Sequence, residues 1–449
     1  MDVTVQDMME ARDRRAETQR RLLDQYRQTL LCFTMNIPGP EKDNALIRQG
    51  FALGQDALRQ GFARLGVQPL YQETRCQATG CEGYYVLPLP PLTVKRLTAD
   101  IEEATPEGRL FDMDVLRPDG AKVERQEVGL PSRRCLICGQ EAYACARSRA
   151  HTVAELREKT MALLRDAIRR DKRQTVARLA CQALLYEVLT TPKPGLVDRL
   201  NQGSHRDMDV FTFATSVSAL QPYFADCADI GHTRAEDAPQ DVFDALRLPG
   251  RMAEGAMLQA TGGVNTHKGA IFSLGILCAA AGRLDKADWQ ADSLLDVCAQ
   301  MTRGLTARDF DGLTAESAVT FGQKLYLSHG ITGVRGEAEQ GFPLVRRYGL
   351  PKLEAGLAAG LSMNDAGCTA LIALMAQNTD TNVIHRSSLE AQRQVAARAA
   401  TLLEKEPFPS AQSLADFDAA LIQENISPGG SADLLALCFL LHFLKEAAQ

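Results

Sequence analysis

The sequence predicts two domains of different class: an α+β domain over residues 1–170 and a larger all-α domain over residues 171–449. The 449 residues exceed the usual length of one domain, and 45% of them are apolar, so each domain can bury a core. Before residue 170, short segments typical of strands are interspersed with helical ones. After it the strand signals fade, and Ala- and Leu-rich helical segments alternate with loops rich in Gly, Pro and Asn. The charged join at 169–173 is not Gly/Ser-rich, which favours a short helical connection.

The N-terminal half begins with a long polar-faced helix. Residues 5–30 contain neither Pro nor Gly and carry a set of arginines: Arg12, Arg14, Arg15, Arg20, Arg21 and Arg27. In a net-acidic chain this helix is the best local docking surface for an acidic protein, although a solvated helix face would look the same. The further elements predicted are a strand at 31–37, a helix at 47–65, a strand at 84–89 ended by Pro90 and Pro91, a hairpin with arms 110–116 and 121–128, and a helix at 152–170.

The C-terminal half is predicted to be helical throughout. Its helices are expected at 174–190, 208–228, 237–260, 268–282, 290–304, 313–327, 351–361, 364–377, 387–405, 411–422 and 431–447.

The composition argues against several classes of protein. A net charge of −6 is unlike that of a general nucleic-acid binder, which needs a basic surface for phosphates. The longest apolar runs, 434–441 and 270–281, fall well short of the roughly 20 residues of a membrane-spanning helix. The first residues show no export signal, and 12 cysteines without one favour reduced thiols over a disulfide scaffold. We therefore expect a cytoplasmic protein without nucleic-acid or membrane partners.

A pair of aspartates lies in the first arm of the predicted hairpin. Side chains two residues apart in a strand point to the same face, so Asp112 and Asp114 project side by side. Two carboxylates this close favour a cation between them, and Mg²⁺ held by carboxylates and substrate phosphates is the usual solution. Such a metal would neutralise charge that develops during nucleotidyl-type transfer, which would make this domain nucleotidyltransferase-like. The alternative is a pair of solvent-facing carboxylates on an amphipathic strand.

A Cys/Arg-rich segment follows the hairpin. Arg133 and Arg134, with Arg109 ahead of the hairpin, are candidates for clamping phosphates. A Cys₃His zinc site opened by a C-x2-C step would use Cys135, Cys138, Cys145 and His151. The later spacings are not those of a standard zinc finger, however, and reduced cysteines often simply pack. Cys76 and Cys81 are either additional ligands or structural residues.

Five loops of the C-terminal half combine ionisable residues with Gly, Pro and Asn. They lie at 191–205, 262–269, 328–339, 379–386 and 425–433. One such loop is common in any helix–helix turn, but five in one all-α domain favour a polyphosphate-and-metal site. The GGVNTHKG loop opens an apolar helix, where backbone N–H groups and Lys268 would attract a phosphate. The spacing of a Walker loop is absent.

Longer motifs in both halves resemble known enzyme families. In the C-terminal half, TPKPGLVDR, GGVNTHKG, LSHGITGVRGEAEQGFP, DTNVIHR and NISPGGSADLL resemble triphosphoribosyl-dephospho-coenzyme-A synthase. In the N-terminal half, FTMNIPGP, GRLFDMDVL, GLPSRRCLICG and CARSRAH resemble apo-citrate-lyase phosphoribosyl-dephospho-coenzyme-A transferase, the citrate lyase holo-acyl-carrier-protein synthase. The two resemblances cover essentially the whole chain and are similar to a fused, bifunctional form of the citrate lyase prosthetic-group pathway.

The resemblance implies two consecutive reactions. The C-terminal domain would join ATP to the 2′-hydroxyl of 3′-dephospho-coenzyme A and release adenine. The N-terminal domain would transfer the phosphoribosyl-dephospho-coenzyme-A unit to a serine of the citrate lyase acyl carrier (γ) subunit and release diphosphate. Loss of diphosphate suits Mg²⁺ on Asp112 and Asp114, and an acidic carrier suits the arginine-rich helix.

Breaking the N-glycosidic bond of ATP builds positive charge on the ribose, so a nearby carboxylate would stabilise it and accept the hydroxyl proton. The candidate carboxylates are Asp198, Glu337, Asp380 and Asp433, with Asp380 also a candidate Mg²⁺ ligand. Substrate and phosphate contacts are expected from Lys193, His267, Lys268, Arg335, Asn382, Gly429, Gly430 and Ser431. Which carboxylate is the base does not follow from the sequence. Two other classes stay open: an all-α nucleotide glycohydrolase with an N-terminal carrier-protein-binding module, and a non-catalytic adaptor with a zinc-bound N-terminal module.

Overall fold

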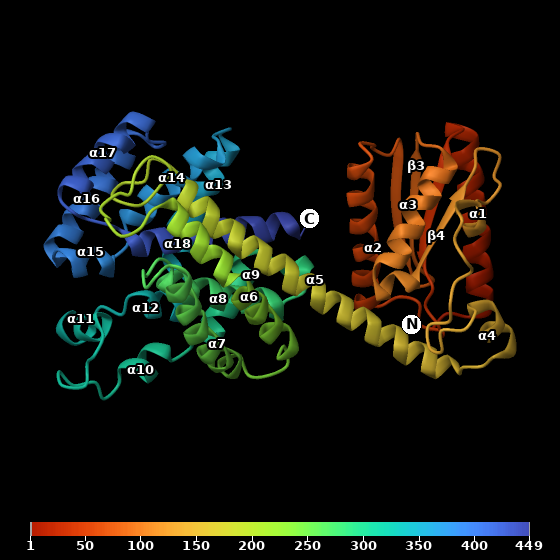
Figure 1. The fold of residues 1–449 in the computed structure, drawn as a ribbon, viewed down its shortest axis with the longest axis horizontal. Helices are drawn as coiled ribbons and strands as arrows, with labels where there is room; N and C mark the ends of the chain where they lie inside the picture. The colour runs from red at the N-terminus through yellow and green to blue at the C-terminus, as the bar shows by residue number, and fades with distance from the viewer. Residues whose placement is uncertain (1, 449) are drawn as a thin grey trace. The chain divides into compact units, whose positions relative to one another are not determined.

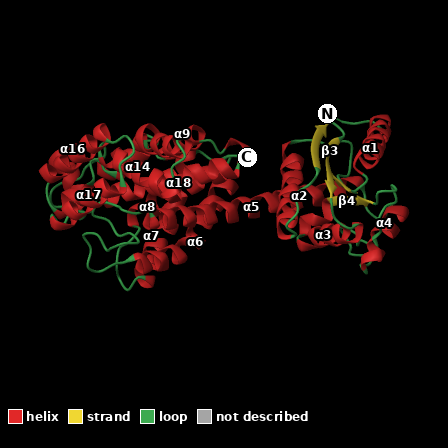
Figure 2. Cartoon of the chain, turned by 90° about the horizontal axis from the view of Figure 1, so that it is seen from above, coloured by secondary structure: helices red, strands yellow, loops and turns green. Residues whose placement is uncertain are grey.

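The computed structural model describes residues 2–448, and the chain divides into two compact units, residues 1–170 and 171–449. We call them the N-terminal unit and the C-terminal unit and describe each by itself. Figure 1 traces the chain through both units, and Figure 2 shows the strands in the N-terminal unit and helices throughout the C-terminal unit. The predicted α+β and mainly helical classes are confirmed. None of the helices among the described residues has a stretch long and apolar enough to cross a membrane.

The N-terminal unit is built on a four-stranded antiparallel sheet with the order β2-β3-β1-β4. Its strands are β1 (Thr29–Met35), β2 (Tyr71–Gln77), β3 (Gly80–Leu87) and β4 (Phe111–Leu116), and its helices are α1 (Val5–Tyr26), α2 (Ala45–Arg64), α3 (Pro91–Ala104) and α4 (Ala142–Ser148). Alternate side chains leave opposite faces of the sheet. Leu31 and Phe33 of β1 pack with α2 and α3, while Leu30 and Cys32 pack with Leu22 of α1. The sheet is therefore covered on both faces.

Helix α3 closes the free edge of β4. Since β4 is the last strand, the backbone of Met113 points away from the sheet, and two buried side chains of α3 meet it. Lys95 Nζ donates to the Met113 carbonyl at 3.3 Å, and Glu102 Oε1 accepts from the Met113 N–H at 3.1 Å. These bonds replace a neighbouring strand and block pairing with another chain.

One local prediction for the N-terminal unit is wrong, and two of its elements were not predicted. The hairpin after β4 is short: Val123 N–H still donates to the Val115 carbonyl at 2.9 Å, but Arg125–Val128 is a 3₁₀ turn rather than a strand. Strand β2 was missed because its exposed, charged residues give no apolar alternation. Helix α3 was not predicted, because Pro90 and Pro91 were taken only as the end of the preceding strand, whereas proline also suits the first turn of a helix.

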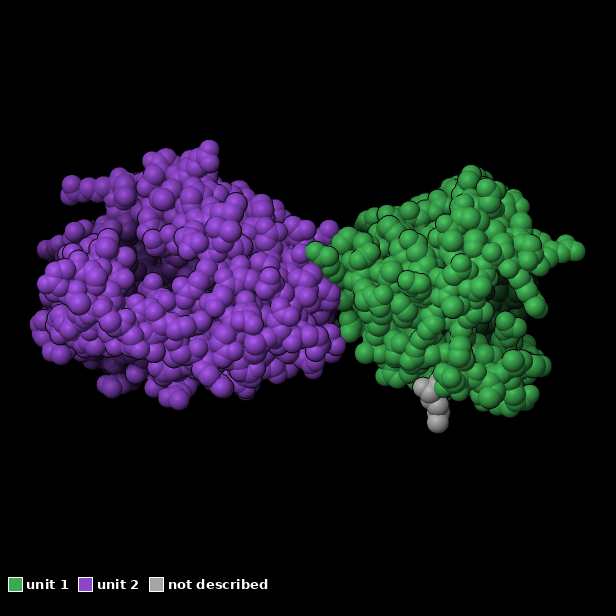
Figure 3. Space-filling model, turned by 90° about the horizontal axis from the view of Figure 1, so that it is seen from below, with its two compact units in different colours: residues 1–170 green, residues 171–449 purple. Residues whose placement is uncertain are grey.

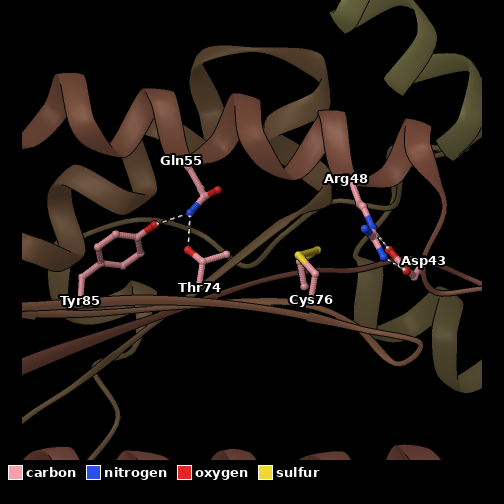
Figure 4. The surroundings of a disulfide bond; sticks show 7 residues. Asp43, Arg48, Gln55, Thr74, Cys76 and Tyr85 are labelled. Carbon is pink, nitrogen blue, oxygen red and sulfur yellow. Dashed lines mark hydrogen bonds and ion pairs between the residues drawn. A yellow bond between two sulfur atoms is a disulfide. The ribbon is translucent and has the colours of Figure 1, made fainter. Parts of the chain in front are cut away.

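A disulfide joins Cys76 and Cys81, which corrects the expectation that all cysteines are reduced thiols. The two residues are directly opposite each other in the β2–β3 hairpin, so the pairing register brings their sulfurs together. Figure 4 shows the side chains around this bond. Gln55 of α2 donates to Thr74 at 2.7 Å and to the Tyr85 hydroxyl at 3.0 Å, which ties the helix to both strands.

The C-terminal unit is mainly helical, and its described residues form no strand. Helix α5 (Val153–Leu189) continues through the boundary at residue 170, so the connection at 169–173 is helical, as predicted. The other helices are α6 (Val210–Thr233), α7 (Pro239–Ala260), α8 (Lys268–Arg283), α9 (Ala291–Met301), α10 (Leu305–Phe310), α11 (Phe321–His329), α12 (Val334–Glu339), α13 (Leu350–Ala358), α14 (Met363–Met375), α15 (Thr381–Arg386), α16 (Leu389–Lys405), α17 (Ala411–Gln423) and α18 (Gly429–Ala447). The helix predicted at 313–327 is wrong in its first half, because residues 311–320 form a loop with Gly312 at positive φ and α11 begins only after its Thr320 cap.

Helices α8 and α18 form the centre of this unit and are buried over most of their length. Small residues let α6 approach α8 closely. A Cβ on Gly231 would lie 2.0 Å from the Ala279 carbonyl oxygen, and a Cβ on Gly282 would lie 2.0 Å from that of Ala228. The close contact with α6 therefore holds the C-terminal half of α8 in a tightly packed core.

Candidate functional site

A cavity of about 690 Å³ lies in the C-terminal unit among the ends of helices. Figure 3 shows the surface of this unit, which is hollowed on the face in view. All five loops predicted to carry ionisable groups contribute to the cavity, through residues within 193–208, 265–269, 330–344, 377–386 and 427–436. Of the predicted site residues, those that line it are Lys193, His267, Lys268, Glu337, Asn382, Gly429, Gly430 and Asp433, whereas Asp198, Arg335, Asp380 and Ser431 lie outside its lining.

Asp198 is buried and organises the loop after α5. Its Oδ2 accepts from the Thr191 hydroxyl at 2.6 Å and from the Lys193 N–H at 2.9 Å, and its Oδ1 accepts from the backbone N–H groups of Leu200 and Asn201 at 2.7 and 3.1 Å. These bonds engage both oxygens. The geometry therefore gives Asp198 a supporting position behind Lys193 rather than one facing a substrate.

Lys193 forms a buried ion pair with Glu187, a residue of α5 that the sequence reasoning missed. The Lys193 ammonium donates to Glu187 Oε1, and both side chains are almost fully buried in the cavity wall. Burial raises the pKa of Glu187, against the favourable charge of Lys193. A lone acid in the apolar final turns of a helix, six residues before a lysine, was the available sequence signal.

His267 precedes α8 and places a ring nitrogen at the cavity. Its Nδ1 lies 2.7 Å from the hydroxyl of Ser216, while Nε2 is buried and has no hydrogen-bond partner among residues 2–448. Burial, and then the charge of Lys193, lowers the pKa of His267 to about 3, so the ring is neutral at pH 7. An orphaned buried nitrogen is costly unless a ligand pairs with it.

Asp433 on α18 faces the first turn of α8. A Cβ on Gly269 would lie 2.0 Å from the Asp433 carboxylate, so glycine is required there for the close approach. Burial, followed by the negative charges of Glu187 and Asp380, raises the pKa of Asp433 well above its usual value. Asp433 is thus a carboxyl that retains its proton to unusually high pH and faces the cavity.

Asp380 is buried beneath the cavity and caps α18. Its oxygens accept from the backbone N–H groups of Gly430 at 3.2 Å and Ser431 at 2.8 Å, from the Ser431 hydroxyl at 3.0 Å, and from the Asn382 N–H at 3.0 Å. The N–H groups expected to bind phosphate at Gly430 and Ser431 therefore already donate to Asp380. The same bonds occupy the oxygens that were expected to bind Mg²⁺, and burial raises the pKa of Asp380.

Glu337 and Arg335 lie on one short helix, α12, but only Glu337 lines the cavity. Glu337 is half-buried and accepts from the Leu344 N–H at 3.2 Å, and burial raises its pKa. The Arg335 guanidinium instead pairs with Asp309 at 2.7 Å and covers the ring of Phe310. In this arrangement Arg335 has a structural partner away from the expected phosphate position.

Another polar contact in the cavity wall, between Arg386 and His205, involves two residues that were not among the predicted site residues. Arg386 Nη2 lies 3.0 Å from His205 Nδ1, and His205 Nε2 lies 2.8 Å from the Ser427 hydroxyl. Burial and then the Arg386 charge lower the pKa of His205 to about 4. Lys268 is more exposed and pairs with Glu254 at 2.9 Å. Lys193, Lys268 and Arg386 are the cationic residues of the lining.

In the N-terminal unit, Asp112 and Asp114 leave the same face of β4, as the alternation predicts. Each already faces a cation. Asp114 lies 2.6 Å from Lys122, and Asp112 lies 3.8 Å from Arg133. Both carboxylates keep part of their surface exposed, so they are accessible to a charged ligand.

Glu102 fixes the arginines beside this pair. It is almost fully buried and lies 2.5 Å from Arg133 and 2.8 Å from Arg125. Arg109 donates to the carbonyl of Arg134, and burial lowers the pKa of Arg109, aided by the neighbouring charges of Arg133 and Arg125. Cations thus surround the two aspartates. The sequence reasoning found Arg133 but missed Glu102 and Arg125, which are distant in the chain.

The segment after Arg134 brings four metal-binding side chains together. One donor atom from each of Cys135, Cys138, Cys145 and His151 lies within 4.8 Å of the others. This is the group expected from the C-x2-C step and the residues that follow it.

The two units match two families of transferases. Residues 173–449 match the CitG family, ATP:dephospho-CoA triphosphoribosyl transferase, and residues 3–167 match the CitX family, apo-citrate lyase phosphoribosyl-dephospho-CoA transferase. The chain belongs to both families and is a fused transferase of citrate lyase prosthetic-group synthesis, which confirms the resemblance found in the motifs.

Individual relatives agree with this assignment. The chain is 37% identical over 455 aligned residues to Protein CitXG of Haemophilus influenzae, covering 98% of this chain and 96% of that protein. It is 46% identical over 262 residues to the 2-(5''-triphosphoribosyl)-3'-dephosphocoenzyme-A synthase of Pectobacterium atrosepticum, covering 58% of this chain and 86% of that protein.

Proposed function

We propose that the C-terminal unit joins ATP to 3′-dephospho-coenzyme A and releases adenine, and that the N-terminal unit transfers the phosphoribosyl-dephospho-coenzyme-A part of the product to a serine of the citrate lyase acyl carrier subunit. The observation that carries the first step is the convergence of five ionisable loops on one cavity within the part of the chain that matches the synthase family. The cavity volume of about 690 Å³ is in the usual range for small-molecule sites.

The first step exchanges one bond for another at the ribose of ATP. The bond from C1 to N9 of adenine breaks, and a bond from C1 to the 2′-oxygen of dephospho-coenzyme A forms. The hydroxyl loses a proton and the departing adenine gains one. We assign the proton acceptor to Glu337 and the proton donor to Asp433, because they are the two predicted carboxyls that line the cavity and Glu337 uses only Oε2 in its bond from the Leu344 N–H. A raised pKa suits Asp433 to the donor role.

The remaining cavity groups bind rather than react. Arg386 and Lys268 offer positive charge to the triphosphate, whereas Lys193 is already paired with Glu187 and supports the cavity wall. The neutral ring of His267 offers Nε2 for one hydrogen bond to the nucleotide or the acceptor sugar, which would satisfy a buried nitrogen that has no partner among the described residues.

In the second step the carrier serine oxygen attacks the α-phosphorus, and the bond from that phosphorus to the diphosphate oxygen breaks. The serine proton passes to the carboxylate of Asp112 or Asp114. Arg133 and Lys122 lie next to these carboxylates and would neutralise the departing diphosphate. This chemistry is of the nucleotidyl-transfer type.

A magnesium ion fits this donor set, because Asp112 and Asp114 present hard oxygen ligands on one face of β4 with part of their surface exposed. When bound there it would supply Lewis-acid stabilisation of the phosphates. The carrier protein would approach over α1, which covers the same face of the sheet and exposes Arg12, Arg20 and Arg21.

The decisive assay incubates the protein with ATP and Mg²⁺, with and without dephospho-coenzyme A, and quantifies free adenine by chromatography. We expect adenine only when the acceptor is present, together with a heavier coenzyme product. Adenine without the acceptor would indicate a nucleotide glycohydrolase instead. Absence of adenine under both conditions would contradict the proposal.

A further inference from the structure

The segment at residues 129–152 has a defined fold without a core of its own. None of these residues is buried, and helix α4 within it has no buried residue either. It nevertheless forms a bridge between Arg134 and Glu141, followed by the helix. Ordering a chain costs conformational entropy, which apolar burial normally offsets. Leu136 packs, partly buried, against a neighbouring apolar cluster, but one such side chain offsets little of this cost, so we expect a further interaction to hold the segment.

The first two cysteines lie in a tight turn that resembles a metal knuckle. The N–H of Gly139 donates to the Cys135 carbonyl at 3.2 Å, and the Cys135 N–H donates to the Gln140 carbonyl at 2.6 Å. Gly139 has φ +72°, which allows the chain to turn back immediately after Cys138. The turn brings the sulfurs of Cys135 and Cys138 within 4.8 Å of each other.

The other two donors arrive from α4 and the residues after it. Cys145 lies in the helix, and the N–H of Ala150 donates to its carbonyl at 3.1 Å, which folds the chain back so that His151 returns to the cysteines. His151 is only partly buried and its ring lies beside the Cys138 sulfur, but its Nε2 atom is shielded from solvent and makes no hydrogen bond of normal geometry within residues 2–448. A buried, unpartnered imidazole nitrogen next to three sulfurs indicates a missing partner that accepts electron pairs.

The distances suit a single ion. The four donor atoms lie within 4.8 Å of one another, and the sulfurs of Cys138 and Cys145 are 3.4 Å apart. A tetrahedral zinc with Zn–S bonds of about 2.3 Å separates its sulfurs by roughly 3.8 Å, so small movements complete the site. A disulfide between Cys138 and Cys145 would leave Cys135 and His151 without a role. Sulfur and imidazole donors favour zinc over magnesium.

We propose that Cys135, Cys138, Cys145 and His151 bind one Zn²⁺ ion in a closed, structural site. With four protein ligands the ion has no open position for a substrate, so it does not take part in the reaction. Its role is positional. Arg133 lies two residues before the first ligand and reaches Glu102 and Asp112, so the ion fixes the segment that presents this arginine to the aspartates of β4.

The first test measures metal in the full-length protein, purified without chelators, by inductively coupled plasma mass spectrometry. We expect about one zinc per chain in the wild type and its loss in Cys138→Ser. The matched control is Cys181→Ser, which removes a partly buried thiol of the C-terminal unit and should keep the metal. His151→Cys should also keep it, because four thiolates form an equally good site. Zinc-free wild-type protein, or a Cys138–Cys145 disulfide found by peptide mass spectrometry, would overturn the proposal.

A second measurement remains informative if Cys138→Ser misfolds. Wild-type protein reconstituted with Co²⁺ in place of zinc should show the intense visible bands of tetrahedral thiolate coordination, and a mercurial thiol reagent should bleach them. A weak octahedral spectrum would contradict the assigned ligands.

The positional role has its own readout. Removing zinc from the wild type should lower carrier loading at least tenfold and leave adenine release unchanged, because the cavity is built from residues 184–436 of the other unit. Readdition of Zn²⁺ should restore loading. A metal-free protein that still loads the carrier at full rate would refute the positional role, and a parallel fall in adenine release would refute its restriction to the N-terminal unit.

Discussion

Glu102 offers the sharpest test of how the N-terminal site is held together. Glu102→Ala removes a buried carboxylate that binds Arg125, Arg133 and the Met113 N–H. Hydrogen bonds to charged groups contribute about 1.5–3 kcal/mol each. Both arginines keep some solvent contact, and Arg125 retains Glu103 as a second partner, so the full sum is not expected. We expect a loss of about 3 kcal/mol, at the lower end of the range for breaking buried ion pairs.

The matched control is Glu103→Ala, the adjacent residue in the same helix. Glu103 also pairs with Arg125 but is about half exposed. Exposed pairs contribute only about 0–1 kcal/mol. The two variants remove the same chemical group from the same helix and differ in burial, so the comparison isolates the buried network.

Hydrogen exchange followed by mass spectrometry measures this locally in the intact chain. A loss of about 3 kcal/mol should accelerate exchange of slowly exchanging β4 and β1 amides by roughly 150-fold in Glu102→Ala. Peptides from α8 in the C-terminal unit serve as the internal reference and should not change. Equal acceleration in both variants, or acceleration in α8, would show that the assigned network does not stabilise this edge of the sheet.

Three further predictions concern the candidate site residues. Asp112→Asn should abolish carrier loading while adenine release persists; loss of both activities in a chromatographic assay would contradict separate sites. Asp433→Asn should abolish adenine release yet stabilise the C-terminal unit by about 1–2 kcal/mol at pH 7, since it removes a carboxylate whose charge is disfavoured by burial. The folded pKa of Asp433 is raised, so above pH 3.8 the folded wild type loses stability relative to an unfolded state in which the carboxyl ionises freely. Below pH 3.8 both states are protonated, and the stability gained by Asp433→Asn should vanish. Urea unfolding followed through Trp289, the single tryptophan, measures this difference. The pKa of His267 is lowered in the folded state, so its neutral ring contributes its full stability above pH 6.5 and loses it as the pH falls towards 3. The corresponding loss in the free energy of unfolding is about 4–5 kcal/mol. In the same unfolding experiment, His267→Gln should remove this acid dependence. An unchanged acid dependence in that variant would show that His267 is not buried as a neutral ring.

The predictable parts of the molecule were those that depend on local periodicity. The shared face of Asp112 and Asp114 follows from alternation in a strand, and helices such as α8 and α18 follow from long apolar segments. The grouping of Cys135 with His151 also has a local cause, since only 16 residues separate them in a short turn and helix.

The rest depends on contacts between residues that are far apart in the chain. Asp380 accepts hydrogen bonds from backbone N–H groups of α18 that lie about 50 residues later in the chain. The sequence does not indicate that these N–H groups already have a carboxylate partner within the protein. The pair of Glu187 and Lys193 is close in sequence, but its burial depends on helices that pack over it from elsewhere. Strand β2 was not predicted for a local reason: its residues are exposed and polar, so they lack the apolar alternation that identifies a strand.

The charge balance of the cavity has a consequence for the form in which ATP arrives. Its lining contains the acids Glu187, Asp207, Glu337 and Asp433, and the bases Lys193, Lys268 and Arg386. With Asp433 protonated, the other acids and the bases balance, so the wall has little net positive charge to attract a free polyanion, and the nucleotide should enter with its charge already screened by a divalent cation. A bound polyanion should also drive the buried carboxyls further towards their protonated forms. Nucleotide binding is then coupled to proton uptake, and calorimetric binding enthalpies should differ between buffers of different ionisation enthalpy.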